Sequence, residues 1–325
     1  MNLFPNLIYE DYLNGKINRN TAINLLRVII ENSDNPLRRI TSLKYLDEIS
    51  PKNDSLFSYI ENLLISDANA ELRFIAADMI RYHFLKKSFR LLKWLLNYED
   101  DYHCSIKVIE SLVEINSLDV RKLFIKELKE ISKIKYLDSI NTYRNKFRKD
   151  VKTLLKGSYL KVIKISELAD ILINFKTIRA LIDKFYTVYY GTKNAHIIKL
   201  DFSEVGWNIN IWKQKYAKRI TNLQDITGLF NLKHLNTLDL SNNRLKYIKN
   251  LSKLKNLQYL YLTNNRLDDP INLEYLKKIG SLKYLDIKGN RITTYLSKHD
   301  FGHLHLRTDG MKSPILQYYF SQLKK

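Results

Sequence analysis

The C-terminal half of this chain repeats one apolar pattern, L-x-x-L-x-L-x-x-N-x-L, which constrains the fold more than any other feature. The pattern occupies Leu235–Leu245, Leu257–Leu267 and Leu282–Ile292, with isoleucine replacing leucine twice in the last copy. The first two copies start 22 residues apart (257 − 235), and the third follows after a slightly longer step. Such a period is typical of a solenoid, in which successive coils stack their apolar side chains into one core. The pattern therefore predicts adjacent parallel strands whose leucines face inward.

The asparagine of each copy, at Asn243, Asn265 and Asn290, falls where the strand must bend away from the sheet. A side-chain amide can both donate and accept, so it can satisfy backbone groups that lose their partners at the bend. With these asparagines in place, the three copies resemble the leucine-rich-repeat family. The 22-residue period and the second apolar set at Ile248, Leu251 and Leu254 resemble its protein-phosphatase-regulator subclass.

In that family the positions between the strand leucines form a concave ligand-binding face. The resemblance implies that a protein partner binds this face here. Tyrosines are frequent hot spots because they offer a large contact area at low entropic cost. The nine residues expected on the concave face are Thr237, Asp239, Ser241, Tyr259, Tyr261, Thr263, Tyr284, Asp286 and Lys288. The alternative is a solvated sheet face without a ligand.

The N-terminal part reads as paired amphipathic helices over residues 20 to about 135. Aligning Leu37, Leu72 and Ile106 gives steps of 35 and 34 residues (72 − 37 and 106 − 72). Each aligned segment begins with Asp or Asn and carries a basic residue directly after its first apolar anchor. This arrangement resembles HEAT-type helical repeats. A helical bundle is the competing structure.

Two stretches, 158–222 and 295–325, follow neither repeat. They are interpreted as caps that cover the two open ends of the leucine-rich solenoid. The first combines a helix, an alternating strand and the bulky residues Trp207 and Trp212. The predicted fold class is α followed by α/β, a helical-hairpin solenoid and then a short leucine-rich-repeat solenoid with a parallel sheet. The predicted domains are 1–157 (HEAT-like), 158–222 (capping segment), 223–294 (leucine-rich repeats) and 295–325 (C-terminal cap).

The net charge of +20 is unevenly spread along the chain. Residues 1–116 hold 14 basic and 16 acidic residues, 117–199 hold 19 and 8, and 200–325 hold 21 and 10. The first segment is therefore slightly acidic, and the whole excess of positive charge follows residue 117. Such an asymmetry favours an acidic partner surface, nucleic acid or anionic lipid. A lysine-rich genome composition is the alternative explanation.

One helix in the basic part carries a row of four cations, Arg144, Arg148, Lys152 and Lys156, each one helical turn after the last. Residues at this spacing share a helix face, so this basic patch could neutralise phosphates. The other interpretation is a solvated helix face. Nucleic-acid binding is therefore the second functional hypothesis, after a protein-binding scaffold or adaptor, and an anionic membrane surface ranks third.

The sequence offers little catalytic chemistry. It contains no phosphate-binding glycine loop and no dinucleotide fingerprint. His299, His303 and His305 lie close together as conceivable metal ligands, but a capping segment needs no ion to explain them. We therefore expect no enzymatic activity, no cofactor and no metal. A single cysteine, Cys104, and an acidic start without an apolar leader indicate a cytoplasmic protein without a transmembrane span; the oligomeric state stays open.

Overall fold

The computed structural model describes residues 4–133, 142–185, 188–203, 205, 219–296, 301–302 and 304–308. Their contacts divide the chain into two compact units. The first, here called the helical unit, comprises residues 1–127 and 163–169, and the second, the sheet unit, comprises 128–162 and 170–325. The predicted fold class, α followed by α/β with leucine-rich repeats, is confirmed. Trp207, Trp212 and the predicted C-terminal cap beyond residue 308 lie outside the described residues.

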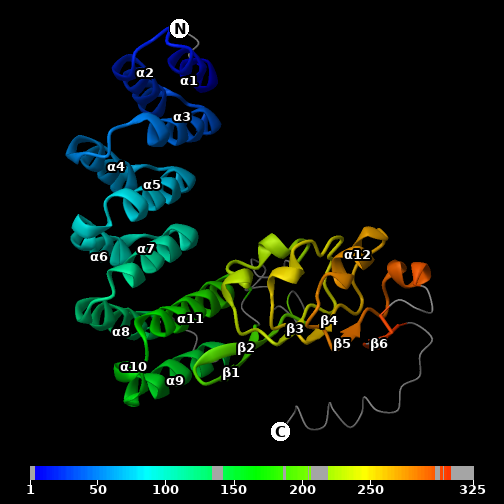
Figure 1. Cartoon of the computed structure of the whole chain (residues 1–325). Coiled ribbons are helices and arrows are strands. Elements are labelled where there is room, and N and C mark those ends of the chain that lie inside the picture. The colour runs from blue at the N-terminus through cyan, green and yellow to red at the C-terminus, as the bar shows by residue number, and fades with distance from the viewer. Residues whose placement is uncertain are drawn as a thin grey trace, which may run out of the picture. The chain divides into compact units, whose positions relative to one another are not determined.

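The helical unit is a stack of helices that pack in pairs, as Figure 1 shows for its N-terminal end. Helix α2 packs on α3, α4 on α5, and α6 on α7, while α3, α5 and α7 contact one another in turn. The elements that contribute to this unit are α1 (Pro5–Leu13), α2 (Arg19–Asn32), α3 (Pro36–Ile49), α4 (Asp54–Ser66), α5 (Ala70–His83), the 3-10 turn η1 (Leu85–Lys87), α6 (Phe89–Tyr98), α7 (Tyr102–Ile115) and the first part of α8 (Leu118–Ser132).

Polar caps define where the second helix of each pair begins. The side chains of Asn35, Asn69 and Asp101 accept hydrogen bonds from backbone N–H groups in the first turns of α3, α5 and α7. Such caps satisfy donors that have no partner inside the helix. Because every second helix starts at such a side chain, the three caps give a common reference for the register of the repeat.

This register corrects the alignment expected from the sequence. Leu37, which the sequence spacing matches with Leu72, is 71% exposed, whereas Leu72 is fully buried. The caps place Arg38 opposite Leu72 instead, one position later. The buried residues Leu46, Ile80 and Leu112 then occupy the same position in α3, α5 and α7. The cap positions therefore define the repeat better than the first apolar residue does.

Adjacent helix pairs are tied by part-buried ion pairs, in which the carboxylate is the more deeply buried partner. Arg39 binds Asp67 and donates to the backbone oxygen of Ile30 at 2.5 Å. One repeat later, Arg73 donates to Glu99 at 2.7 and 2.9 Å and to the backbone oxygen of Asp67 at 2.8 Å. Each arginine thus joins its own helix pair to the turn between the two helices of the next pair.

The sheet unit combines helices with a six-stranded sheet. Its elements are α9 (Thr142–Lys156), α10 (Tyr159–Val162), most of α11 (Ile165–Phe185), β1 (Tyr189–Lys193), β2 (His196–Asp201), η3 (Leu223–Asp225), η4 (Leu229–Asn231), β3 (Thr237–Asp239), η5 (Leu251–Lys253), β4 (Tyr259–Tyr261), α12 (Ile271–Lys277), β5 (Tyr284–Asp286), η6 (Arg291–Tyr295) and β6 (His305–Arg307). None of the helices in the described ranges is both long enough and apolar enough to cross a membrane.

The strands follow the chain order β1 to β6, and β2 to β6 run parallel while β1 pairs antiparallel with β2. Leu200, Leu238, Leu260 and Leu285 lie in register and are fully buried, which forms the core row that the repeats predict. The sheet is wider than the three repeats, because β2 and β6 add one parallel strand on each side. Figure 1 shows these strands side by side along one face of the coils.

Candidate functional site

The concave face consists of the positions between the inward leucines of β3, β4 and β5 and of the residues directly after them. Backbone pairing sets Thr237, Tyr259 and Tyr284 side by side, and it sets Asp239, Tyr261 and Asp286 side by side in the next row. Alternate residues of a strand point to opposite faces, so both rows lie opposite the leucine core. Seven of the nine predicted residues are half-buried, Lys288 is exposed and Asp286 is buried.

The three template asparagines hold the turns at the ends of these strands. Asn265 is typical: its Oδ1 accepts from Leu245 N at 3.1 Å, and its Nδ2 donates to the backbone oxygens of Leu240 and Leu262 at 2.8 and 2.9 Å. Asn243 and Asn290 make equivalent bonds between their own neighbouring coils. The predicted role of these side chains in satisfying backbone groups is confirmed.

The tyrosines form an aromatic cluster on the face. The rings of Tyr261 and Tyr284 are 5.1 Å apart between centroids with planes inclined at 41°. Partial burial, together with the nearby Asp239 and Asp286 carboxylates, raises the pKa of Tyr261 to about 12. Burial and the Asp286 charge likewise raise the pKa of Tyr284. Both tyrosines are therefore neutral at physiological pH and offer a ring and a hydroxyl donor.

Two carboxylates of the same row have different environments. Asp286 is 3% exposed, and its Oδ2 lies 3.3 Å from Arg307 Nη1 on the neighbouring strand β6. At the other end of the row, Asp239 lies beside Asp201 of β2. Burial, and then the charge of Asp201, raise the pKa of Asp239 to about 6. At one end of the row Asp286 thus pairs with Arg307, whereas at the other end Asp239 and Asp201 lie side by side.

Sequence reasoning did not identify Asp201 or Arg307 as part of this surface. Their strands lie outside the repeated pattern, and only the strand pairing brings them beside the predicted residues. The one available signal was the segment Ile197–Phe202, which carries apolar residues at the spacing of the template.

The predicted basic patch lies on helix α9 and not on the strands of the leucine-rich repeats. The side chains of Arg148, Lys152 and Lys156 are exposed, and that of Arg144 lies outside the described side chains. Asp150 on the same helix binds Lys146 at 2.5 Å and accepts from the Tyr190 hydroxyl at 2.8 Å. The neighbouring acid is thus engaged, and the three described cations of the row face solvent.

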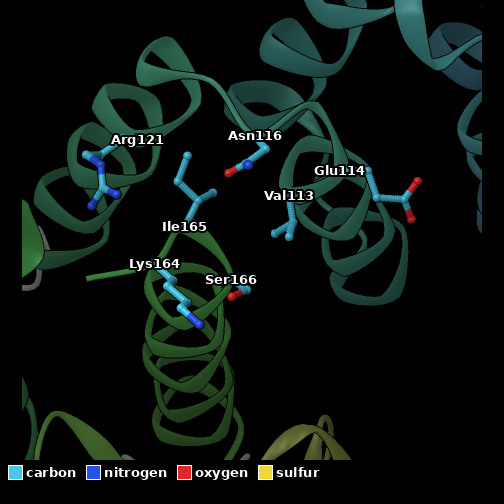
Figure 2. A pocket seen from close by; sticks show the side chains of 7 residues that line it. All are labelled: Val113, Glu114, Asn116, Arg121, Lys164, Ile165 and Ser166. Atoms are coloured by element: carbon cyan, nitrogen blue, oxygen red, sulfur yellow. The ribbon is translucent and has the colours of Figure 1, made fainter. Parts of the chain in front are cut away.

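The helical unit contains a pocket of about 590 Å³ (Figure 2). Its lining comprises Val113, Glu114, Asn116, Arg121, Lys164, Ile165 and Ser166. Two of its charged groups already have partners: Glu114 pairs with Arg81, and Arg121 donates to the backbone oxygen of Ile163 at 2.6 Å. The lining pairs no nucleophile with a base, so we assign it no chemistry.

Of the three histidines considered as metal ligands, only one lies in the described part of the chain. His299 and His303 lie outside the described residues, and His305 is exposed on β6. No cluster of three His, Cys, Asp or Glu residues suited to a metal ion occurs among the residues that the structure describes. Cys104 is fully buried, and this burial raises the pKa of its thiol, so it is a poor nucleophile.

Comparison with known families agrees with this geometry. A family model described as leucine-rich repeats in two copies matches residues 233–275, which cover β3 and β4 and reach into α12. A search of curated proteins finds no match to this chain. The C-terminal part therefore contains leucine-rich repeats, a class of domain that generally mediates protein–protein interaction.

Proposed function

We propose that this chain is a non-enzymatic scaffold or adaptor that binds a protein partner on the concave face. The observation that carries the proposal is the in-register array of half-buried tyrosines beside carboxylates on a parallel leucine-rich sheet. Half-buried rings gain further contact area when a partner covers them, and their side chains are already partly ordered. The identity of the subclass and the HEAT character of the helical unit stay predictions, as do the domain boundaries and the cytoplasmic location.

The face also suggests what the partner presents to it. Asp201 and Asp239 lie side by side with their repulsion only partly offset by Lys199. A lysine or arginine of the partner placed between them would offset this repulsion; Arg307 already supplies such a positive charge to Asp286. We therefore expect a basic side chain of the partner at this end of the face.

The test is affinity purification from native lysate, with and without nuclease, using the full-length wild type and two triple variants. Y259A/Y261A/Y284A removes the aromatic cluster, and Y82A/Y247A/Y295A removes three tyrosines that are exposed elsewhere. A protein retained by the wild type and by the second variant, but lost with the first and insensitive to nuclease, supports the proposal. Equal retention by all three proteins contradicts it.

Alanine at half-buried positions also risks loosening the sheet. A second blocking variant, S241R/T263R, keeps the three tyrosines and covers the face with bulky side chains. Loss of the same protein with this variant, while circular dichroism is unchanged, separates a lost contact from a lost fold.

Nucleic-acid binding is the second candidate, and the exposed row Arg148, Lys152 and Lys156 favours it. Each duplex phosphate that is neutralised should steepen the salt dependence of binding by about 0.9 log units per tenfold salt. Weak binding to random DNA or RNA at about 50 mM salt would exclude this function, since low salt favours phosphate contacts.

A further inference from the structure

A row of arginines runs along the rim of the leucine-rich sheet. Arg244, Arg266 and Arg291 each directly follow the template asparagine, so they recur once in every copy of the pattern. All three side chains are exposed. Within the described part of the chain, none of the three guanidinium groups forms a hydrogen bond or an ion pair.

The backbone beneath this row is firmly held. Arg266 N donates to Leu245 O at 2.9 Å, and Ile292 N donates to Leu267 O at 2.9 Å, so successive coils are bonded at the arginine positions. The turns before the arginines use left-handed residues, Asn242, Asn264 and Gly289, and Asn264 donates to the Asn242 side chain at 2.9 Å. Neighbouring coils in such a sheet are about 4.8 Å apart, so the three cations form a regular ladder.

This arginine ladder (Arg244, Arg266 and Arg291) presents three cations to an anion that runs across the coils. Guanidinium groups bind both carboxylates and phosphates through paired N–H donors. The surroundings distinguish the two. The adjacent concave face carries Asp201 and Asp239, and the exposed Asp268 closely follows Arg266 in the chain. A phosphate backbone fixes a charge at every step and would be repelled by these acids, whereas the flexible acidic side chains of a peptide can turn toward the arginines and away from the acids.

We infer that the arginine ladder binds an acidic, extended segment of a protein partner, which lies along the rim beside the concave face. This inference rests on the proposed function, in that the partner is a protein. The partner would then make two contacts. A basic group of the partner would bind at the concave face, and an acidic segment of the partner would bind at the rim.

The experiment measures binding of a fluorescent polyglutamate peptide and of an oligothymidylate of equal charge to the full-length protein at low salt. The variant R244Q/R266Q/R291Q removes the ladder, and R148Q/K152Q/K156Q removes the same three charges from the exposed face of α9. We expect the first variant to raise the Kd for polyglutamate about tenfold and the second to raise it no more than about twofold. The variant R244K/R266K/R291K should lie between wild type and the first variant, because it keeps charge without the planar fork.

Equal losses in the two glutamine variants would overturn the inference, since net charge alone would then explain binding. So would the absence of polyglutamate binding by the wild type, or tighter ladder-dependent binding of oligothymidylate. These readouts need no natural partner. If the tyrosine variants fail to change partner capture, the concave-face proposal falls while the ladder result can still be read.

Discussion

Two carboxyl groups, one in each unit, are held in opposite ways. Glu99 in the helical unit is 3% exposed at its side chain and accepts hydrogen bonds from Arg73 and from the backbone N–H of Asp101. Burial alone would raise the pKa of Glu99, but these donors hold it below its ordinary value. Asp239 in the sheet unit lies beside Asp201, and burial with that neighbouring charge raises its pKa.

The difference shows how each repeat handles a buried charge. The helical unit pairs two acids of its turns with arginines, Asp67 with Arg39 and Glu99 with Arg73. The sheet unit joins its coils with neutral asparagines and leaves two acids stacked on its face. Asp201 and Asp239 accept hydrogen bonds from Ser203 and Ser241, but neither forms an ion pair within the described residues. Two like charges held side by side cost stability, which is a common feature of surfaces used for binding. The comparison therefore separates a structural ion pair from a candidate binding residue.

The largest expected effect comes from breaking the buried pair in the helical unit. Arg73→Met leaves Glu99 without its guanidinium partner and should cost about 3 to 4 kcal/mol of local stability, because a buried charge is left uncompensated. Native-state hydrogen exchange on peptides from α5 and α7 measures this. Arg90→Met, at an exposed position of α6, is the control and should change protection by less than about 0.5 kcal/mol. Equal protection in Arg73→Met and wild type would show that the ion pair does not stabilise the helical unit.

The same residue predicts a pH dependence. Because the folded pKa of Glu99 lies below 4.5, its contribution to stability is present above that pH and is lost as the pH falls through the folded value. In Arg73→Met, Glu99 stays buried but loses the guanidinium donor, so its folded pKa rises instead of falling. The contribution of Glu99 to stability then no longer decreases with acid. Protection of α5 and α7 in the wild type should therefore fall more steeply with acid than in the variant.

The second effect, of intermediate size, concerns the sheet unit and has the opposite sign. Asp239 binds a proton more tightly in the folded state, with a pKa of about 6 against 3.8, so the stability of the sheet should fall as the pH rises through this interval. Asp239→Asn should then stabilise β3 and β4 by about 1 to 2 kcal/mol at pH 8 and make little difference at pH 4. The control is Asp268→Asn, an exposed acid in the same solenoid. A loss of stability with Asp239→Asn at pH 8 would mean that the bond from Ser241 N to the ionised carboxylate outweighs the repulsion from Asp201.

Much of the sheet unit could be predicted because its information is periodic. The strands β3 to β5, their register and the bonds of the three template asparagines all follow from one template. The two outer parallel strands do not. Leu200 precedes Leu238 by much more than one period of the template, and Val205 occupies the place of the template asparagine, so β2 matches the template only in the spacing of its apolar residues.

The residues of the candidate site could be predicted from the sequence, but the charges around them could not. Its nine residues follow from the template, but their electrostatics depend on Asp201 and Arg307, which belong to the outer strands. A sequence pattern gives which residues share a face, whereas the pKa of Asp239 and the Asp286–Arg307 pair depend on which strand lies alongside. The arginine ladder was visible in the sequence as a repeated Asn-Arg pair, yet its lack of partners required the structure.

The smallest expected effect, that of Leu37→Ala, tests the corrected register of the helical unit when it is compared with Leu72→Ala. Leu37→Ala should change stability by less than about 0.5 kcal/mol, because this side chain is 71% exposed at the start of α3. Leu72→Ala should cost about 3 kcal/mol, since it empties a fully buried position in α5. Urea unfolding followed by hydrogen exchange compares the two variants in the full chain. If both leucines were equivalent, as their sequence spacing suggests, the two costs would be similar, and the capping asparagines would lose their value as markers of the repeat.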